Sequence, residues 1–418
     1  MGVVRVVFFL LVSGLAHFLA ARWLLSTMSP LQRARRKRVV LATAALCASL
    51  LAGMRVIASI RETAFTRTLV AVVMLELGAV VIALLPIGLL TLVGRAIIGL
   101  LGRAKVATAS AKPNANASAE PTASAEASAK EEALPAAQVS RRQAIERVAG
   151  VGLFGVTGMA LGWGMVRGRH AYVIEEVVVR VKGWPRALEG YTIAQVSDVH
   201  VGSFVGDREL DEGFELVRKI RPDLVVATGD LVDFDSGVIG PLALRLANAG
   251  ARDGAYAILG NHDHYAGPTE ILDRLNAMNV RALCNESVRI RSGEGGGFAL
   301  LGVDDIQGRY GHSPGFSGPD LYKAGAGIDG DVPRILLAHQ PRYFKEAAGR
   351  VALQLSGHTH GGQINPGFRP ADLFMDFVAG RYERDGSTLW VNRGFGVAGP
   401  PSRVGAPPEV TKIVLIGA

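Results

Sequence analysis

The segment Val351–Gln363 has the sequence VALQLSGHTHGGQ, in which an apolar run leads into two histidines and a pair of glycines. The run Val351–Leu355 predicts a short buried strand. Two imidazoles that follow a strand with one residue between them can reach neighbouring metal ions. A single histidine is more often an ordinary polar residue, so whether this pair binds metal must be judged from motifs elsewhere in the chain.

Four earlier apolar runs, each a predicted strand, also lead directly into polar motifs. In chain order the motifs are SDVH (197–200) after Tyr191–Val196, GDLVD (229–233) after Leu224–Ala227, GNHD (260–263) after Tyr256–Leu259 and HQP (339–341) after Ile335–Ala338. Ligand sites in α/β sheets lie beyond the carboxyl ends of strands, so the five motifs are expected to converge on one crevice. Each motif alone is weak, but all five in this order are hard to obtain by chance.

Other segments after residue 171 continue the pattern of strands and helices. Tyr172–Val181, Phe298–Val303 and Glu409–Ile416 are further predicted strands, and Glu209–Ile220 and Leu242–Ala249 are amphipathic. Alternating strands and helices predict an α/β layered domain.

Together the motifs resemble the calcineurin-like metallophosphoesterase superfamily, over residues 171–418. The GHTHGGQ segment, the membrane-proximal start and the tail Arg403…Pro408–Glu409 are similar to the bacterial YkuE/YaeI-type membrane-associated phosphodiesterases. The resemblance implies a four-layer α/β/β/α sandwich with two mixed sheets.

The resemblance also implies two divalent metal ions held by seven side chains. They form one set of three, a second set of three and a bridging carboxylate: Asp198, His200 and His360; Asn261, His339 and His358; and Asp230. His262 takes the position of the general acid. Asp233 and Asp263 match positions beside the site, where orienting roles are expected. Mixed nitrogen and oxygen ligands suit manganese, iron or zinc, and the sequence does not choose among them.

Phosphoester hydrolysis gives a chemical reason for these residue types. Two cations ~3.5–4 Å apart can neutralise phosphate oxygens and lower the pKa of a shared water toward ~7. The metal-bound hydroxide would attack phosphorus while His262 protonates the leaving group. These features predict a metal-dependent phosphodiesterase or pyrophosphohydrolase. The alternative is a catalytically silent metal-binding membrane sensor or scaffold, which the complete ligand set disfavours.

Two groups of polar residues near the predicted site can be explained by loop structure without a role in substrate binding. Asp304–Asp305 follow a predicted strand, and capping of a loop is preferred to substrate contact. Arg309, Tyr310 and His312 lie in a Gly/Pro-rich stretch, where phosphate contact and a solvated loop remain equal alternatives.

The first 170 residues differ in composition from the rest of this 418-residue chain, whose hydrophobic fraction is 49%. Four apolar segments approach the ~20 residues that a membrane-spanning helix needs; they are Val3–Leu25, Val39–Ile60, Thr68–Val93 and Val148–Val166. The predicted organisation is a transmembrane region of three helices (1–103), a disordered Ala/Ser/Pro/Glu linker (104–139), a fourth helix (140–170) and the phosphoesterase domain (171–418). Arg141–Arg142 also fits a twin-arginine-like signal anchor, and that alternative stays open.

Basic residues flank these apolar segments and account for much of the net charge of +8. Placing Arg33–Arg38, the arginines after the third segment and Arg141–Arg142 in the cytoplasm puts the catalytic domain outside. A multi-pass protein of the bacterial inner membrane with a periplasmic catalytic domain is therefore expected. Its expected substrate is a phosphoester, with a lipid-linked or envelope molecule suggested by the location. Aromatic residues are not interleaved with the charges, so no nucleic-acid partner is expected. The sequence predicts no oligomeric state.

Three ionisable residues, His17, Arg55 and Glu76, fall inside the predicted spans. Such residues are functional candidates by default, although a structural interpretation is preferred here, in which Arg55 and Glu76 pair between helices or lie near an interface. The chain has two cysteines, Cys47 and Cys284, which excludes a disulfide framework.

Overall fold

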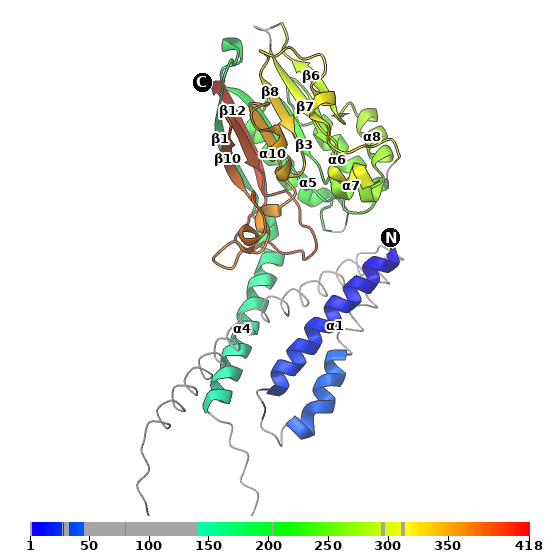
Figure 1. The fold of residues 1–418 in the computed structure, drawn as a ribbon, viewed down its shortest axis with the longest axis vertical. Helices are drawn as coiled ribbons and strands as arrows, with labels where there is room; N and C mark the ends of the chain where they lie inside the picture. The colour runs from blue at the N-terminus through cyan, green and yellow to red at the C-terminus, as the bar shows by residue number, and fades with distance from the viewer. Residues whose placement is uncertain are drawn as a thin grey trace, which may run out of the picture. The chain divides into compact units, whose positions relative to one another are not determined.

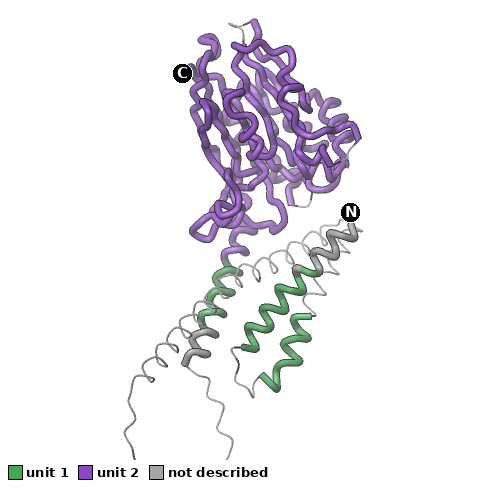
Figure 2. The backbone as a smooth tube through the Cα atoms, viewed as in Figure 1, with its two compact units in different colours: residues 1–159 green, residues 160–418 purple. Residues whose placement is uncertain are grey.

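A computed structural model describes residues 2–26, 28, 33–45, 80, 141–202, 204–293, 297–310 and 314–418. The chain divides into two compact units, Met1–Met159 and Ala160–Ala418 (Figure 2). The boundary lies eleven residues before the predicted start of the catalytic domain at Ala171, inside a helix. The last seven residues of that helix, 160–166, therefore belong with the second unit.

The first unit contains helix α1 (Gly2–Ser26), helical residues 33–45 and most of helix α4 (Arg141–Val166). His17 is buried in α1, and its Nδ1 lies 2.8 Å from the carbonyl oxygen of Ser13. That contact lies within the helix, and the role of His17 stays open. Arg55 and Glu76 lie outside the described residues.

One helical stretch in the part of the chain that the structure describes is long and apolar enough to cross a membrane. It runs over Val148–His170 with a mean hydropathy of 1.5. Helix α1 covers the first predicted span, and residues 33–45 overlap the second. The remainder of the second span, nearly all of the third and the linker 104–139 lie outside the described residues. The multi-pass arrangement thus stays a prediction.

The second unit contains two six-stranded mixed sheets (Figure 1). The first has the order β1-β12-β2-β3-β4-β5, and its neighbouring strands are parallel except for the antiparallel pair β12 and β2. The bounds are β1 Val173–Val181, β2 Tyr191–Val196, β3 Leu224–Thr228, β4 Ala255–Ile258, β5 Arg281–Ala282 and β12 Glu409–Gly417.

The second sheet has the order β10-β11-β9-β8-β7-β6. Its four central strands are parallel, and the edge strands β10 and β6 run antiparallel to their neighbours. The bounds are β6 Glu286–Ile290, β7 Phe298–Gly302, β8 Arg334–Leu337, β9 Leu353–Ser356, β10 Gly380–Arg384 and β11 Ser387–Val391.

Apolar side chains fill both faces of each sheet. Along β3, Leu224 and Val226 face the second sheet, whereas Val225 and Ala227 face helices on the other side. Burial on two faces explains why these strands are continuous apolar runs. The helices are α5 Asp207–Ile220, α6 Gly240–Ala247, α7 Asn261–Ala266, α8 Pro268–Ala277, α9 Leu321–Ala324 and α10 Phe344–Ala347.

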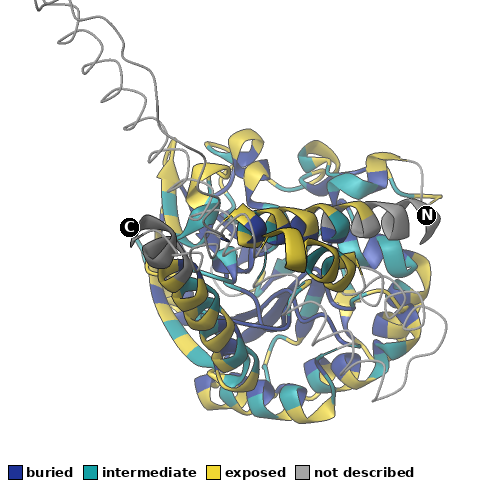
Figure 3. Ribbon diagram, turned by 90° about the horizontal axis from the view of Figure 1, so that it is seen from below, coloured by how far each residue is buried: buried dark blue, intermediate teal, exposed yellow. Residues whose placement is uncertain are grey.

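The core sits between the two sheets, and further apolar clusters lie outside them. One joins the first sheet to α5, α6 and α8, and another joins the second sheet to α9 and its neighbours. Figure 3 shows the buried strands in dark blue, while α4 is mostly exposed or half-buried. The prediction of an α/β domain with two mixed sheets is confirmed.

Four strands are absent from the sequence prediction. β5 has only two residues, and β10 (GRYER) carries charged, exposed residues typical of a protected edge. β6 mixes charged and apolar residues, and all five residues of β11 (STLWV) are buried. β11 completes the second sheet beside β9, which leads into the GHTH motif.

Candidate metal centre

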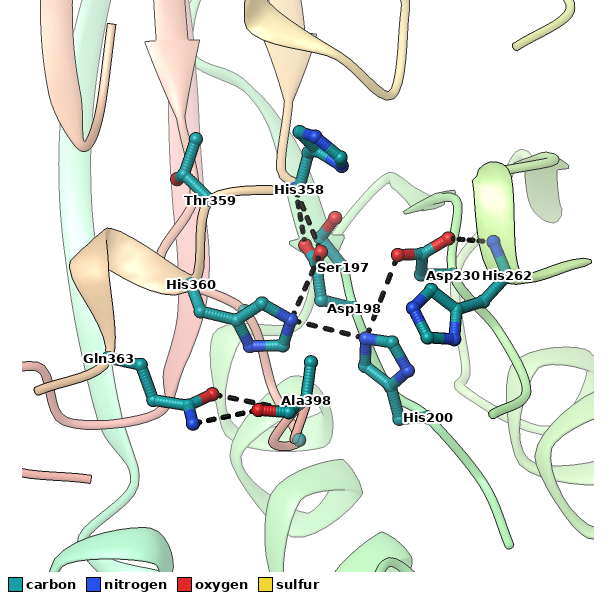
Figure 4. Close-up of polar contacts among 12 residues, drawn as sticks. Ser197, Asp198, His200, Asp230, His262, His358, Thr359, His360, Gln363 and Ala398 are labelled. Carbon is teal, nitrogen blue, oxygen red and sulfur yellow. Dashed lines mark hydrogen bonds and ion pairs between the residues drawn. The ribbon is translucent and has the colours of Figure 1, made fainter. Parts of the chain in front are cut away.

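All seven predicted ligands follow the carboxyl ends of β2, β3, β4, β8 and β9 in the second unit. Six of them, all except Asn261, form two close groups, and Figure 4 shows Asp198, His200, Asp230, His358 and His360. Five of the seven adopt positive φ, which non-glycine residues seldom do; they are Asp198 (52°), His200 (52°), Asp230 (49°), His358 (73°) and His360 (51°). Such conformations cluster at functional sites, where the surrounding fold supports them. These sharp turns point the side chains away from the strand direction.

The first group consists of Asp198, His200 and His360, all three of which are buried. Their ligand atoms lie within 4.8 Å of one another. The Nε2 atoms of His200 and His360 are 3.1 Å apart, and Oδ1 of Asp198 is 3.6 Å from Nε2 of His360. This is the first predicted set.

The second group consists of Asp230, His339 and His358. His339 Nε2 lies 3.2 Å from Asp230 Oδ2 and 3.2 Å from His358 Nδ1. Asp230 Oδ2 is also 3.7 Å from Nε2 of His200, a member of the first group. Asp230 therefore lies between the first group and the pair His339/His358, where a shared ligand must be.

Asn261, the remaining predicted ligand, is the first residue of α7. Its Oδ1 atom is buried and has no hydrogen-bond partner among the described residues. A buried acceptor without a partner is costly, so such an atom calls for a donor or a cation. With imidazole and carboxylate neighbours, the donor set suits a first-row divalent metal ion. The residues present therefore fit a divalent metal centre.

Hydrogen bonds determine which histidine nitrogens can act as ligands. His339 Nδ1 lies 2.8 Å from the carbonyl oxygen of Thr228 and donates to it, so Nε2 is the nitrogen left to face the site. Burial and the charge of His339 lower the pKa of His358 to about 3. Burial and the positive charge of Arg403 hold the pKa of His360 well below its usual value. Both rings are neutral, which is the form that binds metals.

The two buried carboxylates depend on nearby positive charge. Burial alone raises the pKa of Asp230, but the charge and hydrogen bond of His339 hold that pKa well below its usual range. Burial raises the pKa of Asp198, whose two oxygens accept the backbone N–H of His358 at 2.8 and 2.9 Å. A cation beside these groups would stabilise both as carboxylates.

His262 lies at the edge of the cluster with 18% of its side chain exposed. Its backbone N–H donates to Asp230 Oδ1 at 2.8 Å, and its Nδ1 donates to the carbonyl oxygen of Asp233 at 2.9 Å. Burial lowers the pKa of His262, but the Asp233 side chain and the charge of Asp230 raise it to about 9. Asp233 also groups with His200 and His262 as a third possible ligand set.

Asp263 is fully buried and ties two site loops together. Its Oδ1 accepts the backbone N–H groups of Leu231 and Val232 at 2.9 and 3.1 Å, and its Oδ2 accepts that of Gly260 at 2.8 Å. It thereby holds the turn after Asp230 against the start of α7. This geometry supports the orienting role expected for Asp263.

Arg403 is a site residue for which no role was predicted from the sequence. It is 1% exposed, and its guanidinium donates to the carbonyl oxygens of His360 (2.8 Å), Arg393 (2.6 Å) and Gly396 (3.0 Å). Its Nη2 atom also lies 3.0 Å from Nδ1 of His360. One buried arginine thus fixes the turn that carries His360. Its sequence signal is its place in the tail Arg403…Pro408–Glu409, which carries part of the family resemblance without indicating a role for the arginine.

Glycine is required where the site loops approach one another. A Cβ atom added to Gly357 would overlap Ser197 Oγ and Asp198 Oδ2. Gly361 and Gly362 have φ values of 59° and 81°, which suits the close turn expected after His360. Gln363 then fixes the turn, since its Nε2 donates to the carbonyl oxygens of Ala398 and Pro400 at 2.9 and 2.8 Å.

A cavity of about 440 Å³ adjoins His339 and is also lined by Asp305, Arg309 and Arg342. Asp304 also lines this cavity. Its carboxylate accepts the backbone N–H groups of Asp305 and Gly318, which agrees with the loop-capping role preferred from the sequence. Arg309 donates to the carbonyl oxygen of Pro319 at 3.3 Å. Tyr310 is exposed, and His312 lies outside the described residues.

Comparison with known proteins gives a consistent result. The family model for the calcineurin-like phosphoesterases matches residues 191–362. An uncharacterized metallophosphoesterase of Aquifex aeolicus is 32% identical over 58% of this chain and 92% of its own. The uncharacterized metallophosphoesterase YkuE of Bacillus subtilis is 29% identical over 66% of this chain and 98% of its own.

Longer relatives share only part of their length with this chain. A transmembrane protein with a metallophosphoesterase domain from Danio rerio is 33% identical, and the match covers 66% of each chain. The corresponding Bos taurus protein is 35% identical over 61% of this chain and 60% of its own. The chain thus spans less than two thirds of these vertebrate proteins. The motifs, the two-sheet fold and these matches together establish that the chain belongs to the calcineurin-like metallophosphoesterase family.

Proposed function

We propose that this protein is a membrane-anchored phosphodiesterase or pyrophosphohydrolase with two divalent metal ions in its active site. The observation that carries the proposal is the position of Asp230 between the group Asp198/His200/His360 and the pair His339/His358. The first group would hold one ion, and Asn261, His339 and His358 the other, with Asp230 shared. Bound there, two cations would neutralise phosphate oxygens and make a coordinated water more acidic.

His262 would supply the proton for the leaving group. Its Nδ1 is bound to the carbonyl oxygen of Asp233, which leaves Nε2 as the nitrogen that can face a substrate. A pKa near 9 keeps the ring protonated at neutral pH. As water attacks phosphorus and the ester P–O bond breaks, Nε2 would give its proton to the departing oxygen. Asp233 and Asp263 would orient this machinery without touching the substrate.

The cavity beside His339 suggests where the rest of the substrate would lie. Its lining includes three cationic side chains, Arg309, Arg342 and Lys345, and four carboxylates, Asp304, Asp305, Glu346 and Asp376. Lys345 is paired with Asp376. Arginine recognises phosphate groups, so Arg309 and Arg342 are the side chains that would contact a second phosphate there. This composition is compatible with a pyrophosphate or a headgroup phosphodiester.

The proposed location is the bacterial inner membrane, with the catalytic domain on the periplasmic side. Helix Val148–His170 supports an anchor, and two vertebrate relatives are named transmembrane proteins. The orientation rests on the basic residues that precede this helix. A substrate linked to lipid or to the cell envelope follows from that location.

A metal-dependence assay tests the proposed activity. The full chain, purified in nanodiscs and stripped with a chelator, is supplied with Mn²⁺, Fe²⁺ or Zn²⁺ and bis(4-nitrophenyl) phosphate. We expect hydrolysis only after metal is restored. Asp198→Asn should abolish it, whereas Asp273→Asn, at an exposed position on α8, should not. Full hydrolysis by the stripped chain without added metal would refute the proposal.

A further inference from the structure

Residues 366–375, here termed the apolar loop, expose four large hydrophobic side chains. The exposed fractions are 62% for Phe368, 72% for Leu373, 85% for Phe374 and 41% for Met375. Leu373, Phe374 and Met375 are consecutive, whereas the other exposed hydrophobic residues of the second unit's sheets and covering helices are scattered singly. Clustered exposed apolar residues mark interaction surfaces on otherwise soluble domains.

The apolar loop has a fixed base. The backbone N–H of Asn365 donates to the carbonyl oxygen of Val404 at 2.7 Å. The side-chain Nδ2 of Asn365 donates to the carbonyl oxygens of Gly361 and Gly405 at 3.0 and 3.2 Å. Within the loop, Arg369 Nε binds Asp372 Oδ1 at 2.8 Å, beside the short 3-10 helix η7 (Pro370–Leu373). The hydrophobic side chains are therefore presented outward from an ordered frame.

The segment that holds the base of the apolar loop also holds the end of α4. Ser402 Oγ donates to the carbonyl oxygen of Leu161 at 2.9 Å. The backbone N–H of Arg403 donates to the carbonyl oxygen of Gly164 at 3.2 Å. Val404, the next residue, forms the bridge with Ile364. Figure 1 shows the orange loop segments at the end of the domain from which α4 emerges.

The same turn of α4 has features of a membrane boundary. Trp163 and Val166 are 57% and 68% exposed, and the exposed Arg167 follows them. Tryptophan is enriched at the level of lipid headgroups, and basic residues there are attracted to anionic lipids. If α4 crosses the bilayer as proposed above, the boundary between hydrocarbon and water falls at this turn. The apolar loop then lies at the same level.

We propose that the apolar loop docks on the surface of the lipid bilayer and holds the metal centre at the membrane–water interface. The inference rests on the proposed membrane anchor. The ligand His360 lies five residues before Asn365, so a docked loop would bring the site to headgroup level. The substrate would then be a phosphoester carried by a lipid, taken from the bilayer surface. Amphipathic segments bind such interfaces by burying apolar side chains among the headgroups.

Site-specific fluorescence in nanodiscs tests this contact. In the full chain carrying Cys47→Ser and Cys284→Ser, a polarity-sensitive dye is attached at Phe374→Cys or, separately, at Phe368→Cys. The nanodiscs contain phosphatidylcholine and phosphatidylglycerol. We expect emission shifted to shorter wavelength and strong quenching by nitroxide-labelled lipid, with weak quenching by aqueous iodide. Tyr322→Cys on α9 is the matched control; it is 77% exposed and close to the opposite ends of β8 and β9. It should show the reverse pattern.

Two results would overturn the docking proposal. Iodide quenching at both loop positions, like that at position 322, would leave the loop in water. Protection from both quenchers would indicate a protein cover, either a second copy of the chain or residues of its first unit. A dye at Met159→Cys in α4 reports the anchor separately, and metal content of the same samples reports the active site. A lipid-embedded position 159 with bound metal but a water-exposed loop would reject the docking alone.

Discussion

His262 Nδ1 lies 2.9 Å from the carbonyl oxygen of Asp233 and 3.4 Å from one oxygen of the Asp233 carboxylate. This contact fixes the ring and leaves its other nitrogen as the proton donor. We therefore predict that His262→Gln retains its metal but loses ~10²–10⁴-fold in turnover with an alkyl phosphodiester. The loss should be smaller with an aryl phosphodiester, whose leaving group needs less protonation. His170→Gln is the control, and equal losses with both substrates would exclude a general-acid role.

The same pair predicts a pH dependence in the metal-free chain. Burial lowers the pKa of His262, but the Asp233 side chain and the charge of Asp230 raise it to about 9. Because the folded-state pKa is raised, protonation stabilises the fold fully below about pH 6.5, and this stabilisation is lost as pH rises toward 9. Imidazole NMR titration of the chelated chain should show the ring of His262, assigned by its loss in His262→Gln, titrating near pH 9. Asp233→Asn should lower that pKa toward 6.5, and an unchanged value would contradict the assignment.

Arg403 is predicted to position the ligand His360 rather than to contact substrate. Arg403→Lys removes the planar set of donors that reaches the carbonyl oxygens of His360, Arg393 and Gly396. We expect metal affinity to fall about 10–100-fold, as for other residues that orient ligands. Competition with a chelating dye measures this change, and Arg350→Lys serves as an exposed control. A wild-type affinity in Arg403→Lys would show that the contact is dispensable.

The proposed orientation predicts opposite behaviour of two reporter fusions. Alkaline phosphatase fused after Ala418 should be active, because it matures only outside the cytoplasm. The same enzyme inserted near Thr122, in the predicted linker, should be inactive, whereas a cytoplasmic fluorescent reporter should be bright there. Both expectations follow from the basic residues assigned to the cytoplasm. An inactive phosphatase after Ala418 would reject the periplasmic assignment and leave the metal-site geometry untouched.

The strands that lead into the site could be predicted from sequence because each combines an apolar run with a polar motif. β3 is an example. Its residues are buried on both faces of the sheet, so its LVVA segment shows no alternation of apolar and polar residues, and the turn at Gly229–Asp230 follows directly. The edge strand β10 carries charges instead, and its pairing with β11 is set by the tertiary structure. Edge strands therefore lack the signal on which the prediction relied.

The same distinction applies within the site. All seven predicted ligands come from local motifs, and the structure brings six of them into two close groups. Arg403 lies 43 residues beyond His360 in the sequence, and its contacts depend on the turn after β11. The positive φ values of residues such as Asp198 and His358 are likewise imposed by packing between loops. These features belong to the folded chain and have no counterpart in a short sequence pattern.

The central claim is that Asp230 is shared by two metal ions, and elemental analysis of metal content tests it most directly. Wild-type protein in nanodiscs should contain about two first-row metal ions per chain. Asp230→Asn should lose most of both, whereas Asp273→Asn should retain them. The measurement is inductively coupled plasma mass spectrometry after gel filtration, with circular dichroism confirming that both variants are folded. Two tightly bound ions in Asp230→Asn, or an active wild-type chain without metal, would contradict the account.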